Sequence, residues 1–237
     1  LALDDVAVHT DRLRIDHLSL SVRCGEVIGL AGLEGSGQRL FMQACAGILP
    51  VRSGSLRLDG AEMAGQPYRR FQGRGVALVP AARLEEGLIA GMSLREHFAL
   101  ASGGRGLMVP WDEADALAGE RIDKYHIVGR PESLVQELSG GNQQRAVLSL
   151  LPADLRVLLL EHPTRGLDIE SAAYIWELLL ARREQGAAIL FTSTDLDELA
   201  QYADRIVVFS GGVMSRPVDA RSITVDALGH LIGGREL

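Results

Sequence analysis

The sequence LSGGNQQR, residues 138–145, begins a predicted helix. Ser139 precedes two glycines, and no helix breaker follows Asn142 until Pro152. A serine in this place can cap the first free N–H groups of a helix, and glycines let the backbone come close to a ligand. Unpaired N–H groups and the positive end of the helix dipole make such a terminus suitable for a phosphate. A serine cap alone would indicate only where a helix starts.

A glycine-rich loop, GLEGSG at residues 32–37, lies between a short apolar run at 27–31 and a helical stretch that reaches about Gly47. A strand, a glycine turn and a helix in this order cradle phosphates, with the general pattern G-x-x-x-x-G-K-[ST]. Here Gln38 and Arg39 occupy the lysine and hydroxyl positions. A tight turn without a ligand is the alternative. The candidate nucleotide-binding residues are Gly32, Glu34, Gly35, Ser36, Gly37, Gln38 and Arg39.

The composition narrows the classes of protein. The chain has 237 residues, 47% hydrophobic and 23% charged, as expected of a globular protein with a sizeable core. A net charge of −7 argues against nucleic acid as the main partner. No apolar run reaches the ~18 residues of a membrane span, and no signal peptide begins the sequence. Cys24 and Cys45 match no metal spacing, which predicts reduced thiols in a cytosolic protein.

The pattern of apolar residues predicts an α/β fold. Residues 3–22 alternate, indicating two or three antiparallel strands, and residues 53–60 indicate a further edge strand. Residues 92–136 have mostly helical spacing, interrupted by a glycine-rich turn at 102–106 and by Pro110, which indicates an inserted helical subdomain. Strands that alternate with helices predict a mostly parallel sheet. Further strands are expected at 27–31, 76–79, 157–160, 187–191 and 206–209, and helices at 142–151, 169–184, 196–203 and 225–232.

Residues 138–145 resemble the signature motif of ABC-type ATPases, and their GNQQ ending is typical of sugar and nucleoside importers. The sequence PTRGLD at 163–168 is similar to the D-loop of that family, with Asp168 in its usual place. The resemblance extends from about Val8 to Met214. It implies a single ABC-type P-loop NTPase domain over 1–237, with a RecA-like mixed sheet core and an N-terminal antiparallel β subdomain. The core would comprise 1–91 and 153–237, and the helical subdomain with the signature helix 92–152.

Other motifs of the family can be located by their position in the sequence, but their key residues differ here. Glu161 takes the place of the Walker B aspartate, as a weak Mg²⁺ ligand, and His162 that of the glutamate that polarises the attacking water. Ala81 stands at the Q-loop position and Thr194 at the switch histidine. Arg83 and the Gly-Leu at 87–88 keep the rest of the importer-type Q-loop segment. No aromatic residue for adenine is evident, and Val8 and His9 lie nearest to its expected place.

Two residues have alternative interpretations. Arg39 either folds back to replace the missing positive charge of the lysine, or is a solvated surface arginine. His162 either acts as a general base, since its ordinary pKa is ~6.5, or is protonated beside phosphates and only contacts them.

The resemblance implies an asymmetric mechanism. The stations that handle ATP in the chain's own loop are altered, whereas Ser139, Gly140, Gly141, Gln143 and Asp168, which serve a facing subunit, are intact. Glu161 and His162 are the doubtful catalytic pair. The chain would be a degenerate ATP-binding half of a sugar or nucleoside importer. Its cofactors would be ATP and Mg²⁺. Its partners would be a second ABC nucleotide-binding domain and a membrane permease, at the cytoplasmic side of the membrane. Leu1 in place of Met fits the second half of a tandem chain.

Two alternatives remain. The chain could be an active ATPase with rewired groups, in which Arg39 supplies charge and His162 orients the water. It could also be a soluble ABC-type regulator that responds to nucleotide and has no permease. ATP turnover by the isolated chain would distinguish the first alternative, and a permease partner would argue against the second.

Overall fold

The computed structural model describes residues 1–101 and 109–234, which form two compact units. The core unit comprises Leu1–Leu78, Asp154–His162 and Leu179–Leu237, and the helical unit comprises Val79–Ala153 and Pro163–Leu178. The predicted glycine-rich turn at 102–106 lies outside the described residues. The bounds predicted for the helical subdomain stay a prediction.

An antiparallel sheet of four strands begins the core unit, in the order β2-β1-β4-β5. Its strands are β1 (Ala2–His9), β2 (Arg14–Ser21), β4 (Ser53–Leu58) and β5 (Ala61–Glu62). The prediction of an edge strand at 53–60 was wrong, because β4 pairs with β1 on one side and with β5 on the other. The edge is formed by the two-residue β5, which is too short to be detected by alternation.

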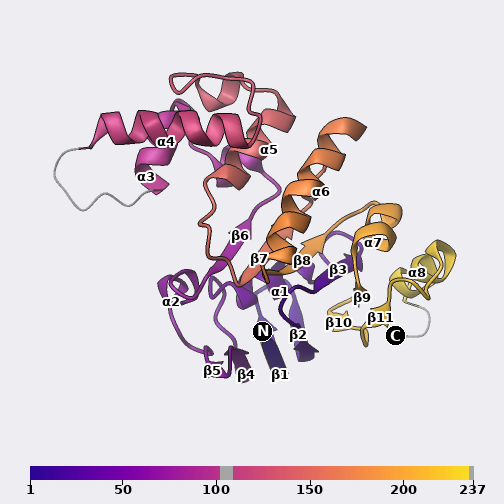
Figure 1. The fold of residues 1–237 in the computed structure, drawn as a ribbon. Helices are drawn as coiled ribbons and strands as arrows, with labels where there is room; N and C mark the ends of the chain where they lie inside the picture. The colour runs from indigo at the N-terminus through magenta and orange to yellow at the C-terminus, as the bar shows by residue number, and fades with distance from the viewer. Residues whose placement is uncertain (102–108, 235–237) are drawn as a thin grey trace. The chain divides into compact units, whose positions relative to one another are not determined.

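A second sheet of seven strands follows the order β10-β9-β3-β8-β7-β6, with β11 also paired to β9. The neighbours β9, β3, β8 and β7 are parallel, as predicted. Both α7 and α8 lie on the β3–β9 side, next to each other (Figure 1). The strands are β3 (Val27–Gly32), β6 (Val76–Val79), β7 (Val157–Glu161), β8 (Ala188–Thr192), β9 (Arg205–Ser210), β10 (Val213–Met214) and β11 (Val218–Asp219).

The hydrophobic core of this unit joins both sheets to the helix that follows β3. Phe41 of α1 (Gln38–Cys45) packs against Phe209 of β9, with ring centroids 5.5 Å apart. Ile15 and Leu18 of β2 and Leu30 of β3 belong to the same buried cluster. The glycine loop between β3 and α1 is therefore anchored at both ends by buried side chains. The remaining helices of this unit are α2 (Tyr68–Gln72), α7 (Leu196–Tyr202) and α8 (Val225–Ile232).

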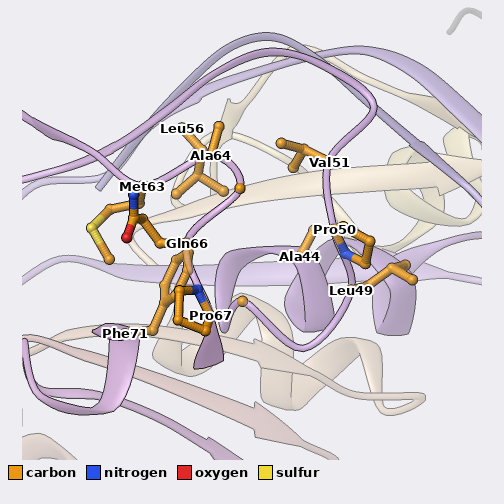
Figure 2. A pocket seen from close by; sticks show the side chains of 12 residues that line it. Ala44, Leu49, Pro50, Val51, Leu56, Met63, Ala64, Gln66, Pro67 and Phe71 are labelled. Atoms are coloured by element: carbon orange, nitrogen blue, oxygen red, sulfur yellow. The ribbon is translucent and has the colours of Figure 1, made fainter. Parts of the chain in front are cut away.

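A cavity of about 210 Å³ lies where the end of α1, the β4–β5 hairpin and α2 meet (Figure 2). Leu49, Pro50 and Val51 line one side, and Met63 and Phe71 line the other. Among the described lining residues the cavity has one polar side chain, Gln66, and no charged one. It offers no group that would hold a phosphate.

The helical unit contains α3 (Leu94–Ala101), α4 (Trp111–Lys124) and α5 (Gly140–Ser149). A π-helical turn, Arg83–Gly87, follows β6, and a 3-10 turn, Val135–Glu137, precedes the signature helix α5. The first part of α6 (Ile169–Glu184) also belongs to this unit. No helix in the described ranges is long and apolar enough to cross a membrane.

Candidate phosphate-binding and signature sites

The glycine loop connects the carboxyl end of β3 to the first turn of α1. Gly37, just before α1, has φ 129, a conformation that L side chains rarely adopt. A Cβ at Gly37 would also come 2.5 Å from the Cδ1 of Ile15. Leu33, Glu34 and Gly35 of the loop are exposed. The loop thus has the backbone path of a phosphate cradle, because the first N–H groups of α1 have no partner within the helix.

Gln38, at the position of the P-loop lysine, is used by the loop itself. Its Nε2 donates to the carbonyl of Leu33 at 3.3 Å, and the Ser36 N–H donates to the same carbonyl at 3.0 Å. The Gln38 side chain is only 8% exposed. A neutral amide held in this way fastens the loop to itself and brings no positive charge to a phosphate.

Arg39, at the hydroxyl position, lies beside the acid at the end of β7. Its Nε is 3.5 Å from Oε1 of Glu161, and the Glu161 side chain is 5% exposed. The strand order β3-β8-β7 explains the contact, because parallel strands bring their carboxyl ends to one edge of the sheet. Arg39 is 53% exposed and is paired with Glu161. It is therefore more than a solvated surface arginine.

The residues around Glu161 do not fit a magnesium ion. Mg²⁺ prefers hard oxygen ligands in octahedral geometry, whereas a guanidinium offers only N–H donors and a positive charge. The positive charge of Arg39 lies beside Glu161, the carboxylate at the Walker B position. Within the described residues, no group of three or more His, Cys, Asp or Glu side chains could hold a metal ion.

His162 and Thr194 follow the ends of β7 and β8 in the same unit. The backbone N–H of His162 donates to the carbonyl and to the Oγ1 of Thr192, both at 3.1 Å. His162 has φ 47, which is uncommon for a non-glycine residue and indicates local strain. Thr194 is exposed.

The adenine and Q-loop positions offer few polar groups. Val8 is fully buried, and the His9 Nε2 lies 2.6 Å from Oδ1 of Asp16. Ala81 precedes the π-helical turn and belongs to the helical unit, where its methyl group cannot ligate a metal or a water.

The signature motif begins α5 as the sequence predicts. Ser139 is the N-cap, and its Oγ accepts from the N–H of Asn142 at 3.4 Å and from Asn142 Nδ2 at 2.9 Å. Gln143 Nε2 donates to the carbonyls of Val135 at 3.3 Å and Leu138 at 3.0 Å. Ser139 is exposed. The start of α5 is thereby held in place while its cap stays accessible.

The D-loop aspartate caps the next helix and is packed next to the signature glycines. Asp168 Oδ1 accepts from the N–H of Ser171 and Oδ2 from its Oγ, each at 2.8 Å. The hydrogen bond from the Ser171 backbone is the main reason why the pKa of Asp168 lies below its ordinary value. A Cβ at Gly141 would meet the Ser171 Oγ at 3.0 Å. Gly141, Ser171 and Asp168 therefore form one tightly packed row within the helical unit.

Sequence reasoning missed the role of Arg83. Its Nε donates to Oε1 of Gln144 at 2.7 Å, and its Nη2 donates to the carbonyl of Arg165 in the D-loop. Burial lowers the pKa of the guanidinium. Arg83 thus joins the segment after β6, the signature helix and the D-loop. The only signal in the sequence was that Arg83 keeps the importer-type pattern, which says nothing of its partners.

The candidate residues fall into two groups by unit. The core unit holds the glycine loop, Arg39, Glu161, His162 and Thr194, and the helical unit holds the signature motif, Asp168 and Ala81.

A family model described as ABC transporter matches residues 15–165, and the chain belongs to this family. It is 32% identical to the nucleoside import ATP-binding protein NupA of Lactococcus lactis, covering 99% of this chain and 48% of that protein. It is 38% identical to the ribose import ATP-binding protein RbsA 1 of Mesorhizobium japonicum, covering 92% of this chain and 44% of that protein. The chain thus spans less than half the length of these two relatives.

Two solved structures share the fold. One, an ATP-binding subunit of an ABC transporter, gives a TM-score of 0.78 at 21% identity and covers 98% of each chain. Another, a dimeric ATP-binding cassette bound to ADP and phosphate, gives a TM-score of 0.76 at 21% identity, covering 94% of this chain and 99% of that one. The predicted ABC-type α/β fold is confirmed.

Proposed function

We propose that the chain is an ATP-binding domain of a sugar or nucleoside importer that is degenerate in its own site. In this proposal it works through its signature motif on ATP held by a second ATP-binding domain. The relatives named above are a nucleoside and a ribose import ATP-binding protein, and they support this class of substrate. A membrane permease at the cytoplasmic side of the membrane would be the other partner.

The contrast between the two groups of residues carries the proposal. Ser139 is an exposed N-cap of α5, and Gly141 leaves room for Ser171, whose N–H donates to Asp168 of the D-loop. In the core unit, Gln38 is tied to the loop and Arg39 is paired with Glu161. Removal of one charged stabiliser of phosphoryl transfer can lower the rate by orders of magnitude. The preserved parts are those that would face a partner's γ-phosphate.

The test is ATP turnover by the importer assembled with its permease and partner ATP-binding domain. The variant Ser139→Glu places a carboxylate where the γ-phosphate would be contacted, and we expect turnover to fall at least about tenfold. Ser222→Glu is the matched control, since it adds the same charge at an exposed turn of the core unit. Unchanged turnover in Ser139→Glu would contradict the proposal.

The rewired ATPase is the second candidate, favoured by the proximity of Arg39 to Glu161. Phosphate release from Mg·ATP by the purified chain separates the two. A background rate is expected of the degenerate domain. A clear rate that disappears in His162→Ala would favour the rewired enzyme.

A further inference from the structure

Arg39 occupies the place that a metal-binding hydroxyl has in the general P-loop pattern, and its guanidinium is directed to the carboxylate that would share the metal. We propose that the loop of this chain binds its nucleotide without a divalent cation, with the Arg39 guanidinium in the place of Mg²⁺. This inference deepens the proposed function and rests on it, because it concerns the nucleotide that the chain's own loop would hold.

The ion pair has one buried end and one accessible end. Glu161 is 5% exposed and ends a strand whose residues are all buried, so its negative charge is held in a poorly solvated place. Arg39 is 53% exposed, so a ligand can reach it from solvent. A guanidinium has five N–H donors in a planar fork, more than one carboxylate can use. Arg39 can therefore hold Glu161 and a phosphate together.

A magnesium ion would have to compete with this guanidinium. Glu161 is ion-paired with Arg39. The hydroxyl that would bind the metal is replaced by a guanidinium, which only donates hydrogen bonds. A divalent cation beside a guanidinium is repelled, and displacement of Arg39 would take from the buried Glu161 carboxylate the counter-charge it now has. Both the charge of Arg39 and the lack of an oxygen ligand at its position thus disfavour Mg²⁺ binding.

The loop keeps the other requirements for a phosphate. The positive φ of Gly37 and the closeness of Ile15 leave no room for a side chain at this position, so the backbone can turn into α1 as a phosphate loop does. The first N–H groups of α1 and the dipole of this helix are favourable to an anion. Lysine and Mg²⁺ together would supply three positive charges, whereas Arg39 supplies one and Gln38 none. A nucleotide should therefore bind here more weakly than in a loop with both lysine and Mg²⁺. Added Mg²⁺ should not tighten this binding, because Glu161 is already paired with Arg39 and the hydroxyl ligand is missing.

The experiment is equilibrium binding of the fluorescent nucleotides mant-ATP and mant-ADP to the purified chain, in EDTA and in excess Mg²⁺. We expect binding in EDTA that is at least as tight as in Mg²⁺. In Arg39→Ser, which restores a hydroxyl and frees Glu161, binding in EDTA should weaken at least about tenfold, the effect of a lost charged hydrogen bond. Mg²⁺ should then strengthen binding to this variant.

Arg52→Ser is the matched control, because Arg52 is an exposed arginine of the same unit, and its binding should equal that of the wild type. A single cooperative unfolding transition above the assay temperature in all three proteins would establish that each is folded, although Arg39→Ser should unfold at a lower midpoint because Glu161 loses this partner. The inference is overturned if the wild type binds nucleotide more tightly in Mg²⁺ than in EDTA, if it binds nucleotide in neither condition, or if Arg39→Ser binds as tightly in EDTA as the wild type. None of these results affects the Ser139→Glu test in the assembled importer, so the two proposals fail separately.

Discussion

Arg83 donates a 2.7 Å hydrogen bond from its Nε to Oε1 of Gln144, a side chain that is only 2% exposed. The same guanidinium donates to the backbone carbonyl of Arg165. One side chain thus ties the signature helix to the D-loop from a third segment of the helical unit. Ala81, two residues before Arg83, has no polar side chain, so Arg83 makes the hydrogen bonds of this segment to Gln144 and Arg165.

Replacement of Arg83 by alanine should therefore lower the free energy of unfolding by about 1–3 kcal/mol, because buried Gln144 loses its donor. Urea unfolding measures the change. Arg165→Ala is the matched control, since only the backbone carbonyl of Arg165 accepts the hydrogen bond and its side chain is exposed. Equal midpoints for Arg83→Ala and Arg165→Ala would show that the hydrogen bonds of Arg83 contribute little.

Gly141→Ala should disturb function more than stability. Alanine gains up to ~1 kcal/mol over glycine in a helix. The new Cβ at 3.0 Å would push the Ser171 Oγ, and rotation of that hydroxyl would lose its hydrogen bond to Asp168, worth about 0.5–1.5 kcal/mol. We expect an unfolding free energy within about 1 kcal/mol of wild type, and reduced ATP turnover in the assembled importer.

The double variant Gly141→Ala with Ser171→Gly removes the contact and is the check on this explanation. If displacement of Ser171 is the cause, the second substitution should change turnover by less in the Gly141→Ala background than in the wild type. Additive effects would mean that Gly141 acts through another contact.

The Asp168 cap predicts a pH dependence of stability. Because its folded pKa lies below its ordinary value, the carboxylate stabilises the fold above the unfolded pKa, and this contribution is lost as the pH falls through the folded pKa. Unfolding midpoints of wild type and Asp168→Asn should thus differ most near neutral pH and converge below about pH 4. A difference that grows on acidification would contradict the assigned hydrogen bonds.

The two cysteines should react differently with a thiol reagent. Cys24 is exposed, whereas Cys45 is buried, and burial raises the pKa of its thiol to about 12. The thiolate is the reactive form. Ellman's reagent at pH 8 should modify one thiol in the native chain and two in urea, and Cys24→Ser should remove the native reaction. Rapid modification of both native thiols would show that the core around α1 opens easily.

Much of the fold could be predicted because its elements have strong local patterns. The predicted bounds 169–184 and 225–232 are those of α6 and α8. The error at 53–60 arose because β5 has two residues, fewer than alternation needs. The Ser139 cap was predictable for the same local reason, since its partner Asn142 is three residues away.

The contacts of the two arginines could not be predicted from the sequence. Arg39 meets Glu161 only because the sheet order places the ends of β3 and β7 at one edge with β8 between them. Arg83 gains its partners from two other segments that packing brings to it. The sequence shows only that both side chains are cationic. The partners of each arginine depend on the tertiary structure.

The hydrogen bonds described for Ser139, Asn142 and Asp168 are made to residues of the helical unit, and those of Gln38 and Arg39 to residues of the core unit. Substitutions in the glycine loop therefore leave these hydrogen bonds of the signature motif in place. The chemistry of the glycine loop can therefore change while the signature motif keeps its geometry. By the same reasoning, lysine and threonine can be introduced at positions 38 and 39 without any change to the signature helix.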